Sequence, residues 1–371
     1  MENVSLESRL DDAKFRRRLY IGLNIASLFG FAGLMAVAAF YDLQISQAIG
    51  DMNNLFGTFF EVVGEAPSYL VLPFCAPIFF YNAKNFSDKR FRIFMRVFGL
   101  VLSWLGYFMW IYAGTKPGRI DVVYGIPGLT MFAVFGGFVG GALGLWVGSL
   151  IKPQVMERLL KFAVFSLVFM VAALLVMQGL KMLWGRMRFR DMLAAGSYEG
   201  FTPWYVVNVG GTEETFKSFP SGHTSSAANI FILAAACDVF PKLRSFKARA
   251  IINSFCAVFV MVVAVSRIVN CAHFLSDVLV GGYGTYLIFV LVRYLFFGKG
   301  KYEYDLSRFK QGSEAKPRAA EEAQAGAGDA ERENAPAGTV DAGEGVNAAA
   351  QEQATEIEPE EKAAAQTESD E

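Results

Sequence analysis

Residues 163–180 read AVFSLVFMVAALLVMQGL and contain no charged side chain. A helix of about 20 apolar residues spans the hydrocarbon core of a bilayer. Residues 181–190, KMLWGRMRFR, follow directly and bring four basic side chains. This stretch therefore predicts a membrane helix that ends in a cluster of positive charge.

The same apolar pattern recurs along the chain, which has 371 residues, 54% of them hydrophobic, and 35 phenylalanines. This content exceeds what one soluble core needs. Further apolar segments of spanning length or slightly shorter occupy 19–41, 67–83, 93–114, 129–151, 224–240, 251–266 and 274–297. We therefore predict an all-α polytopic membrane helix bundle with about eight transmembrane helices in a domain over 19–300.

Basic residues distinguish two sides of this bundle. One side carries 16 of them, in the segment 1–18 and in alternate loops: Arg9, Lys14, Arg16, Arg17, Arg18, Lys84, Lys89, Arg90, Arg92, Lys152, Arg158, Lys161, Lys242, Arg244, Lys247 and Arg249. Short loops rich in Lys and Arg remain in the cytoplasm. With eight crossings both termini are then cytoplasmic, and we expect a multi-pass protein of the plasma (inner) membrane.

The end of the chain has a different composition. Residues 311–371 hold 16 acidic and 4 basic side chains, a net charge of −12, which leaves residues 1–310 with a net charge of +11. A segment of Ala, Glu, Gln, Gly and Ser cannot bury enough apolar surface to fold. We expect residues 301–371 to form a disordered acidic cytoplasmic tail, and we expect no nucleic-acid partner.

The segment between the first two predicted spans, 45–63, places phenylalanines among polar residues. An amphipathic segment of this kind can lie in the membrane interface as a helix. A simple loop is the alternative interpretation.

Several basic residues fall on the outer side, against the positive-inside pattern: Lys181, Arg186, Arg188, Arg190, Lys217 and Arg267. Such residues need an anionic partner. Two partners fit, namely a bound phosphate and the headgroups of membrane lipids, which arginines at helix ends often contact.

The two histidines of the chain also lie on this side. His223 ends the tetrapeptide Pro220-Ser221-Gly222-His223, directly before a predicted helix. A glycine at a helix start allows close approach to free N–H groups, which favours phosphate. Ordinary helix capping by Ser221 is the alternative.

His273 and Asp277 are four residues apart at the head of the last predicted helix, so they share a face. A carboxylate in that position can orient an imidazole for catalysis. A structural hydrogen bond is the alternative interpretation of the pair taken alone.

Taken together, these residues resemble a known signature. Lys181 is followed after six residues by Arg188, then come Pro220-Ser221-Gly222-His223, and then Ser266-Arg267, five residues, His273, three residues and Asp277. This order is similar to the three-part motif of the type 2 phosphatidic acid phosphatase superfamily, within 181–277. The sequence departs from the motif at Phe189, where the family usually has a proline, and this puts the local turn in doubt.

The resemblance implies a role for each matching residue. His273 would be the nucleophile that forms a phosphohistidine, Asp277 would orient it, and His223 would be the general acid and later the base. The phosphate oxygens would be held by Lys181, Arg188, Ser221, Gly222 and Arg267. No metal and no other cofactor is implied, because the acidic residues of the outer loops are scattered and the four cysteines lack ligand spacing.

The resemblance implies a phosphatase acting on a lipid phosphate or polyprenyl diphosphate at the outer, periplasmic face. Phosphoryl transfer to another lipid through the same intermediate is one alternative. A non-catalytic transporter or scaffold of the same fold is another, although such a protein has no physical reason to retain both histidines.

Overall fold

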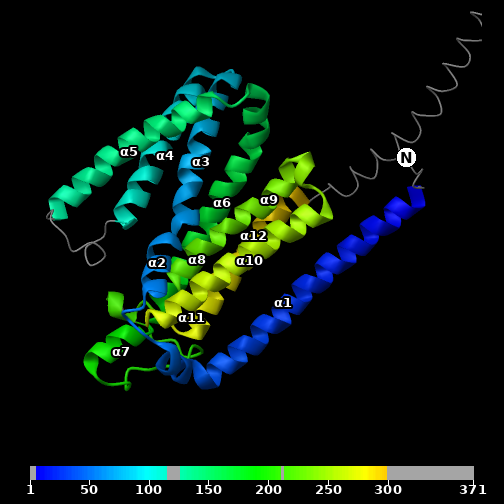
Figure 1. Ribbon diagram of the computed structural model, residues 1–371. Helices are drawn as coiled ribbons and strands as arrows, with labels where there is room; N and C mark the ends of the chain where they lie inside the picture. The colour runs from blue at the N-terminus through cyan, green and yellow to red at the C-terminus, as the bar shows by residue number, and fades with distance from the viewer. Residues whose placement is uncertain (1–5, 115–125, 210–212, 299–371) are drawn as a thin grey trace, which may run out of the picture. The chain divides into compact units, whose positions relative to one another are not determined.

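The computed structural model describes residues 6–114, 126–209 and 213–298. Within these ranges the chain is helical and contains no strand (Figure 1). This confirms the all-α bundle. The tail expected at 301–371 lies outside the described residues, as does the very start of the chain, and that prediction stands as made.

Twelve α-helices make up the described part of the chain (Figure 1). Their bounds are α1 Leu6–Ile49, α2 Leu55–Val63, α3 Ala66–Asn82, α4 Lys89–Gly114, α5 Ile126–Ser149, α6 Pro153–Trp184, α7 Phe189–Ala195, α8 Gly222–Ala228, α9 Ile232–Val239, α10 Phe246–Val269, α11 Leu275–Leu279 and α12 Thr285–Arg293.

Seven helical segments of the described chain are long and apolar enough to cross a membrane, where the sequence predicted eight. The difference lies at 224–240, where a 3-10 turn over Asn229–Phe231 separates α8 from α9. The Asn229 amide donates to the carbonyls of Ser225 and Ser226 at 3.2 and 3.4 Å. A side chain that bonds the preceding turn competes with regular helix geometry, so this segment is an interrupted helix instead of a continuous span.

The segment predicted at 45–63 divides between two helices. Its first residues continue α1 to Ile49, and α2 begins only at Leu55. The Asn54 side chain caps α2 by accepting from the backbone N–H groups of Phe56 and Gly57 at 3.0 and 3.3 Å. The segment is thus helical at 45–49, as the end of α1, and at 55–63, while residues 50–54 are not helical.

Aromatic side chains fill the core between the long helices. Phe165 and Phe169 of α6 pack against Phe289 of α12 with ring centroids 6.2 and 5.5 Å apart, and Phe231 meets the same ring at 5.7 Å. The outer faces are apolar too, since Phe135 on α5 is 61% exposed. An apolar exterior around an aromatic core suits a protein surrounded by lipid.

Glycines allow α5 to lie closely against α4 and α3. A Cβ atom on Gly140 would lie 2.7 Å from the Tyr107 ring of α4, and one on Gly148 would lie 2.3 Å from Pro77 of α3. Small residues at such spacing permit close helix contact in membranes. The glycines of α5 therefore face α4 at Gly140 and α3 at Gly148.

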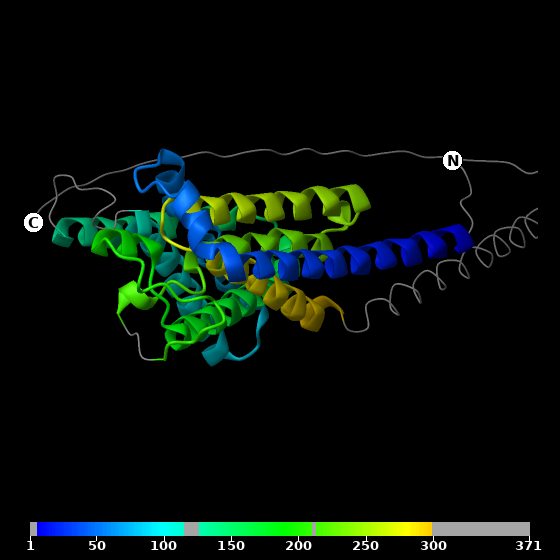
Figure 2. The same cartoon turned by 90° about the horizontal axis from the view of Figure 1, so that it is seen from below.

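The short helices gather at one end of the bundle. Figure 1 shows α2, α7 and α11 together at the lower end of the view, and Figure 2 shows α1 running beside α10 toward the same region. After α11 the helix widens into a π-helical turn, Val280–Gly284. There a Cβ on Gly281 would lie only 2.4 Å from the Ser221 carbonyl oxygen, so this glycine lets the last helix approach the start of α8.

Candidate active site

The residues predicted to carry chemistry come from five helical elements that meet at this end of the bundle. Lys181 lies in the last turn of α6, and Arg188 is the N-cap of α7. Ser221, Gly222 and His223 form the start of α8. Arg267 lies in the last turn of α10, while His273 and Asp277 flank the first residue of α11. The fold therefore brings all eight residues into one region.

Direct contacts tie these segments together. The Ser221 N–H donates to the Asp277 carbonyl oxygen at 2.9 Å, which joins the second and third motifs. A Cβ atom added to Gly222 would lie 3.1 Å from Lys181 Nζ, so the first motif lies next to the second. A larger side chain at 222 would crowd this cation. The glycine thus keeps space for an anion beside Lys181.

His273 is buried, with 3% of its surface exposed. Its Nδ1 atom lies 2.8 Å from the Ser218 carbonyl oxygen and 3.6 Å from Asp277 Oδ2. A carbonyl only accepts, so Nδ1 carries the proton and Nε2 keeps its lone pair. The sequence predicted that Asp277 would be the hydrogen-bond partner. The Ser218 carbonyl is instead the hydrogen-bond partner of Nδ1, and the Asp277 carboxylate interacts with the imidazole electrostatically from a longer distance.

Burial lowers the pKa of His273 to about 4, and the nearby cations Lys181 and Arg267 act in the same direction. The charge of Asp277 opposes this change but does not cancel it. The imidazole is therefore neutral at pH 7. A neutral ring with a fixed tautomer and an unprotonated Nε2 is suited to act as a nucleophile.

Asp277 is fully buried and accepts several hydrogen bonds. Its Oδ2 receives the Ser218 hydroxyl at 2.5 Å and the Phe274 N–H at 3.0 Å. Its Oδ1 receives Arg186 Nη1 at 2.6 Å. The carboxylate thus organises the loop that carries His273 as well as facing the imidazole.

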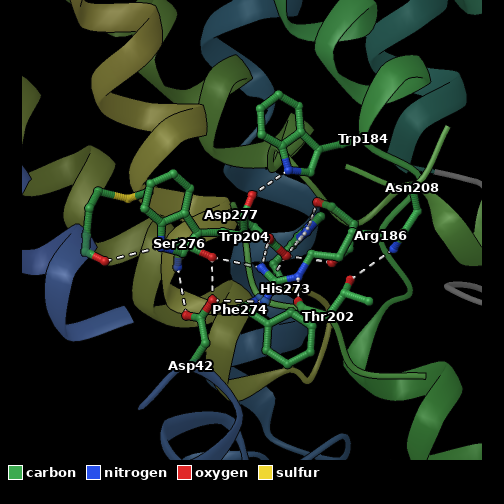
Figure 3. Close-up of polar contacts among 12 residues, drawn as sticks. Asp42, Trp184, Arg186, Thr202, Trp204, Asn208, His273, Phe274, Ser276 and Asp277 are labelled. Atoms are coloured by element: carbon green, nitrogen blue, oxygen red, sulfur yellow. Dashed lines mark hydrogen bonds and ion pairs between the residues drawn. The ribbon is translucent and has the colours of Figure 1, made fainter. Parts of the chain in front are cut away.

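Arg186 is the largest departure from the sequence prediction. It was grouped with basic residues that could contact lipid headgroups, but it is fully buried. Its guanidinium binds Asp277 on one side and Asp42 of α1 on the other, the latter at 3.0 Å, and its Cζ atom lies 4.2 Å from the centre of the Phe274 ring (Figure 3). Lipid contact is therefore wrong for this residue. A sequence signal existed in Asp42, an acidic residue at the end of an apolar span that needs a buried partner.

Arg188 and Arg267 present guanidinium groups with different partners. Arg188 Nη2 pairs with Glu214 at 3.1 Å, while its buried Nε has no hydrogen-bond partner in the structure. Arg267 is fully buried and its Nη2 lies 3.4 Å from Glu61 of α2. Hydrogen bonding from Lys217 lowers the pKa of Glu214, which keeps that partner charged. An incoming phosphate could satisfy the Nε donor of Arg188.

Phe189, the departure from the family motif, begins α7 without disturbing the turn. It is 1% exposed and packs against Phe274 with ring centroids 5.8 Å apart. The preceding Arg188 has an extended backbone, with φ −78° and ψ 146°. This is the conformation that a following proline would favour. Here the packing of Phe189 stabilises the turn that a proline ring stabilises in the family motif.

Ser221 serves as the N-cap of α8, as the capping interpretation predicted. Its buried hydroxyl oxygen accepts from the Thr224 hydroxyl at 3.0 Å and from the Thr224 N–H at 3.4 Å. The hydroxyl proton remains available as a donor. Capping is observed, and phosphate contact by Ser221 stays a prediction.

His223 faces a carboxylate that the sequence analysis did not single out. Its Nε2 lies 3.7 Å from Oε1 of Glu65, in the turn between α2 and α3. One helical turn earlier, Glu61 contacts Arg267 and Asn270. Nothing in the linear sequence relates Glu61 and Glu65 to the motifs, so these contacts could be found only from the three-dimensional structure.

The arrangement can hold an anion between cations and offer it a nucleophile. Lys181, Arg188 and Arg267 supply positive charge, and His273 supplies a neutral imidazole beside it. His223 adds a second imidazole that can transfer a proton. Within the described residues, no three His, Cys, Asp or Glu side chains are grouped as a metal site.

A comparison with protein-family models agrees with this geometry. The model of the PAP2 superfamily matches residues 162–301, which contain all eight motif residues. No curated protein and no solved structure matched the chain. Residues 162–301 therefore match the PAP2 superfamily, in agreement with a type 2 phosphatidic acid phosphatase superfamily member, within a helical bundle that has seven candidate membrane spans among its described residues.

Proposed function

We propose that this protein hydrolyses the phosphomonoester or diphosphate group of a membrane lipid through a phosphohistidine on His273. Members of the PAP2 superfamily are phosphatases, so the chain is a phosphoric ester hydrolase in general terms. The observation that carries the finer proposal is the hydrogen bond from His273 Nδ1 to the Ser218 carbonyl. It leaves Nε2 as an unprotonated nucleophile near the cations Lys181 and Arg267.

In the first step, His273 Nε2 attacks phosphorus and the bond from phosphorus to the leaving oxygen breaks. His223 gives its proton to that oxygen, so the lipid departs as an alcohol or as a lipid monophosphate. In the second step, water attacks the phosphohistidine and His223 accepts a proton from it. Inorganic phosphate leaves, and both imidazoles return to their starting states.

The cations lower the barrier by meeting charge on the equatorial oxygens. Lys181 and the Gly222 N–H would bind from the α6 and α8 side, and Arg188 and Arg267 from the α7 and α10 side. Positive side chains fixed by the fold do not need to reorganise as the charge develops. Asp277 keeps the His273 loop in place and favours the positive charge that the imidazole gains on phosphorylation.

We further propose that the site faces the outer side of the plasma membrane. The turns α3–α4 and α5–α6, which carry basic residues, lie at the upper end of Figure 1, away from α7 and α11. The positive-inside rule makes that upper end cytoplasmic. A lipid substrate could then reach His273 with its tail still in the outer leaflet.

The test is phosphate release by the purified protein in detergent. The substrate panel would contain a polyprenyl diphosphate, phosphatidic acid, phosphatidylglycerophosphate and a soluble sugar phosphate, each beside His273→Ala. We expect release from at least one lipid and none from the variant. Transfer of label from lipid phosphate to a second lipid, with little free phosphate, would favour the phosphotransferase instead.

A further inference from the structure

Helix α2 and the turn that follows it lie outside the segment that matches the superfamily, yet Glu61 of α2 and Glu65 of this turn reach motif residues. Glu61 Oε2 lies 3.4 Å from Arg267 Nη2 and accepts from the Asn270 amide at 2.7 Å. Glu65 Oε1 lies 3.7 Å from His223 Nε2. Because Gly64 and Glu65 keep helical backbone angles after α2, the four-residue spacing puts both carboxylates on the same side of the chain, toward Arg267 and His223.

The two carboxylates have different surroundings. Glu61 is shared between an arginine and an amide, so its charge is largely balanced. Glu65 receives the Tyr69 hydroxyl on Oε2 at 3.2 Å and turns its other oxygen to the imidazole of His223. Its side chain is 12% exposed. Glu65 is thus held in place and directed at the proposed general acid.

The charges around His223 otherwise oppose its protonation. Lys181 Nζ lies beside Gly222, the residue before His223; Arg188 lies near Lys181, and Arg267 pairs with Glu61, four residues before Glu65. Four other carboxylates near the motifs pair with cations: Asp277 and Asp42 bind Arg186, Glu61 binds Arg267, and Glu214 binds Arg188 and Lys217. Three nearby cations favour the neutral form of an imidazole. A general acid must carry a proton at the working pH, so His223 needs a local negative charge.

We propose that Glu65 is the positioning residue of the general acid His223, orienting its ring and favouring its protonated form. This inference rests on the proposed function. It gives the two histidines separate electrostatic partners, because His273 is kept neutral by burial beside Asp277 while His223 is kept charged by Glu65. Each histidine then begins the reaction in the protonation state that its step requires.

The experiment compares Glu65→Gln with wild type on two substrates of the same enzyme. The lipid substrate has an alkoxide or phosphate leaving group that needs a proton, and p-nitrophenyl phosphate has an aryl leaving group that departs without one. For the lipid we expect kcat to fall about tenfold at pH 7 and the alkaline limb of the pH–rate profile to move down by about one pH unit. For p-nitrophenyl phosphate we expect the rate constant for phosphoenzyme formation to change less than twofold.

Controls separate a local electrostatic effect from a structural one. Glu199→Gln removes an exposed carboxylate from the loop that precedes α8 and should leave both profiles unchanged. Glu65→Asp keeps the charge, and we expect its alkaline limb to stay near that of wild type even where kcat falls. In the double variant Glu65→Gln/His223→Ala, the loss should equal that of His223→Ala alone.

The outcomes also separate this inference from the proposed function. If wild type releases no phosphate, or His273→Ala remains active, the proposed function fails. If His223→Ala shows the leaving-group dependence and Glu65→Gln does not, the function stands and the assignment of Glu65 is overturned. An equal loss by Glu65→Gln on both substrates, or a limb that moves in Glu65→Asp as far as in Glu65→Gln, would overturn it as well.

Discussion

Asp42 of α1 and Arg186, which precedes α7, form an ion pair of 3.0 Å in which neither side chain is exposed. Arg186 uses its other Nη atom for Asp277, so one guanidinium connects the N-terminal helix to the proposed catalytic carboxylate. Ser276 strengthens the connection by donating its N–H to Asp42 at 3.0 Å. The position of the His273 loop therefore depends on α1, a helix outside the segment that matches the superfamily.

The first prediction concerns Asp42→Asn. This change removes the charge of one of the two carboxylates that bind the buried Arg186, and removing one partner of a buried ion pair costs about 3 kcal/mol. We expect lower thermal stability in detergent and a loss of turnover of at least tenfold, because the contacts of Arg186 to the Asp277 region would rearrange. Asp51→Asn, which alters an exposed carboxylate after α1, is the matched control. Unchanged stability and turnover in Asp42→Asn would show that the pair is dispensable.

Sequence alone predicted the helical class and the residues that converge on the site. The order and spacing of the three motifs identified Lys181, His223 and His273, because each motif lies at the end of a predicted helix. Apolar length located most spans. It failed at 224–240, where Asn229 interrupts a segment that hydropathy treats as continuous.

The contacts that cross between distant helices could not be read from the sequence. Arg186 resembled a surface cation because its partner Asp42 is 144 residues away. Glu65 likewise has no sequence relation to His223 and meets it only through the packing of α2 against α10 and of α3 against α8. The Ser218 carbonyl is a backbone group, and no side-chain pattern indicates which carbonyl will orient an imidazole.

The second prediction separates the two histidines. His273→Ala removes the proposed nucleophile, so phosphate release should fall about 10⁴-fold or more and no acid-labile phosphoenzyme should form. His223→Ala should still accept phosphate from p-nitrophenyl phosphate and then hydrolyse the intermediate slowly, so labelled phosphoenzyme accumulates. Rapid quench with labelled substrate measures both. Labelled phosphoenzyme in His273→Ala would assign the nucleophile to another residue.

The third prediction is that chelators do not inhibit. The oxygens of a bound phosphate would be met by Lys181, Arg188 and Arg267, which provide the charge neutralisation that other phosphatases obtain from metal ions. Phosphate release in excess EDTA should therefore equal release in magnesium to within twofold. Arg188→Lys should lower kcat/KM at least tenfold, because an ammonium cannot reproduce the fork of donors. A strict requirement for a divalent ion would contradict this account of the site.

The last prediction follows from the pKa of about 4 that burial gives His273. Protonation of Nε2 removes the nucleophile, so the acid limb of kcat/KM should lie near pH 4 and not near the ordinary histidine value of about 6.5. The same difference links pH to stability. The unfolded chain takes up this proton first as the pH falls, so the neutral histidine stabilises the fold fully above pH 6.5 and this stability is lost progressively toward pH 4.

Between pH 6.5 and pH 4, the difference in the pKa of His273 between the folded and unfolded chain lowers the free energy of unfolding by about 3 kcal/mol. His273→Ala should therefore unfold at a temperature less dependent on pH between 6.5 and 4 than wild type does. Thermal unfolding of both proteins in the same detergent, recorded across that range, measures the difference. Parallel curves, or an acid limb of kcat/KM near pH 6.5, would mean that His273 is more solvated in the working enzyme than its position behind Ser218 and Asp277 implies.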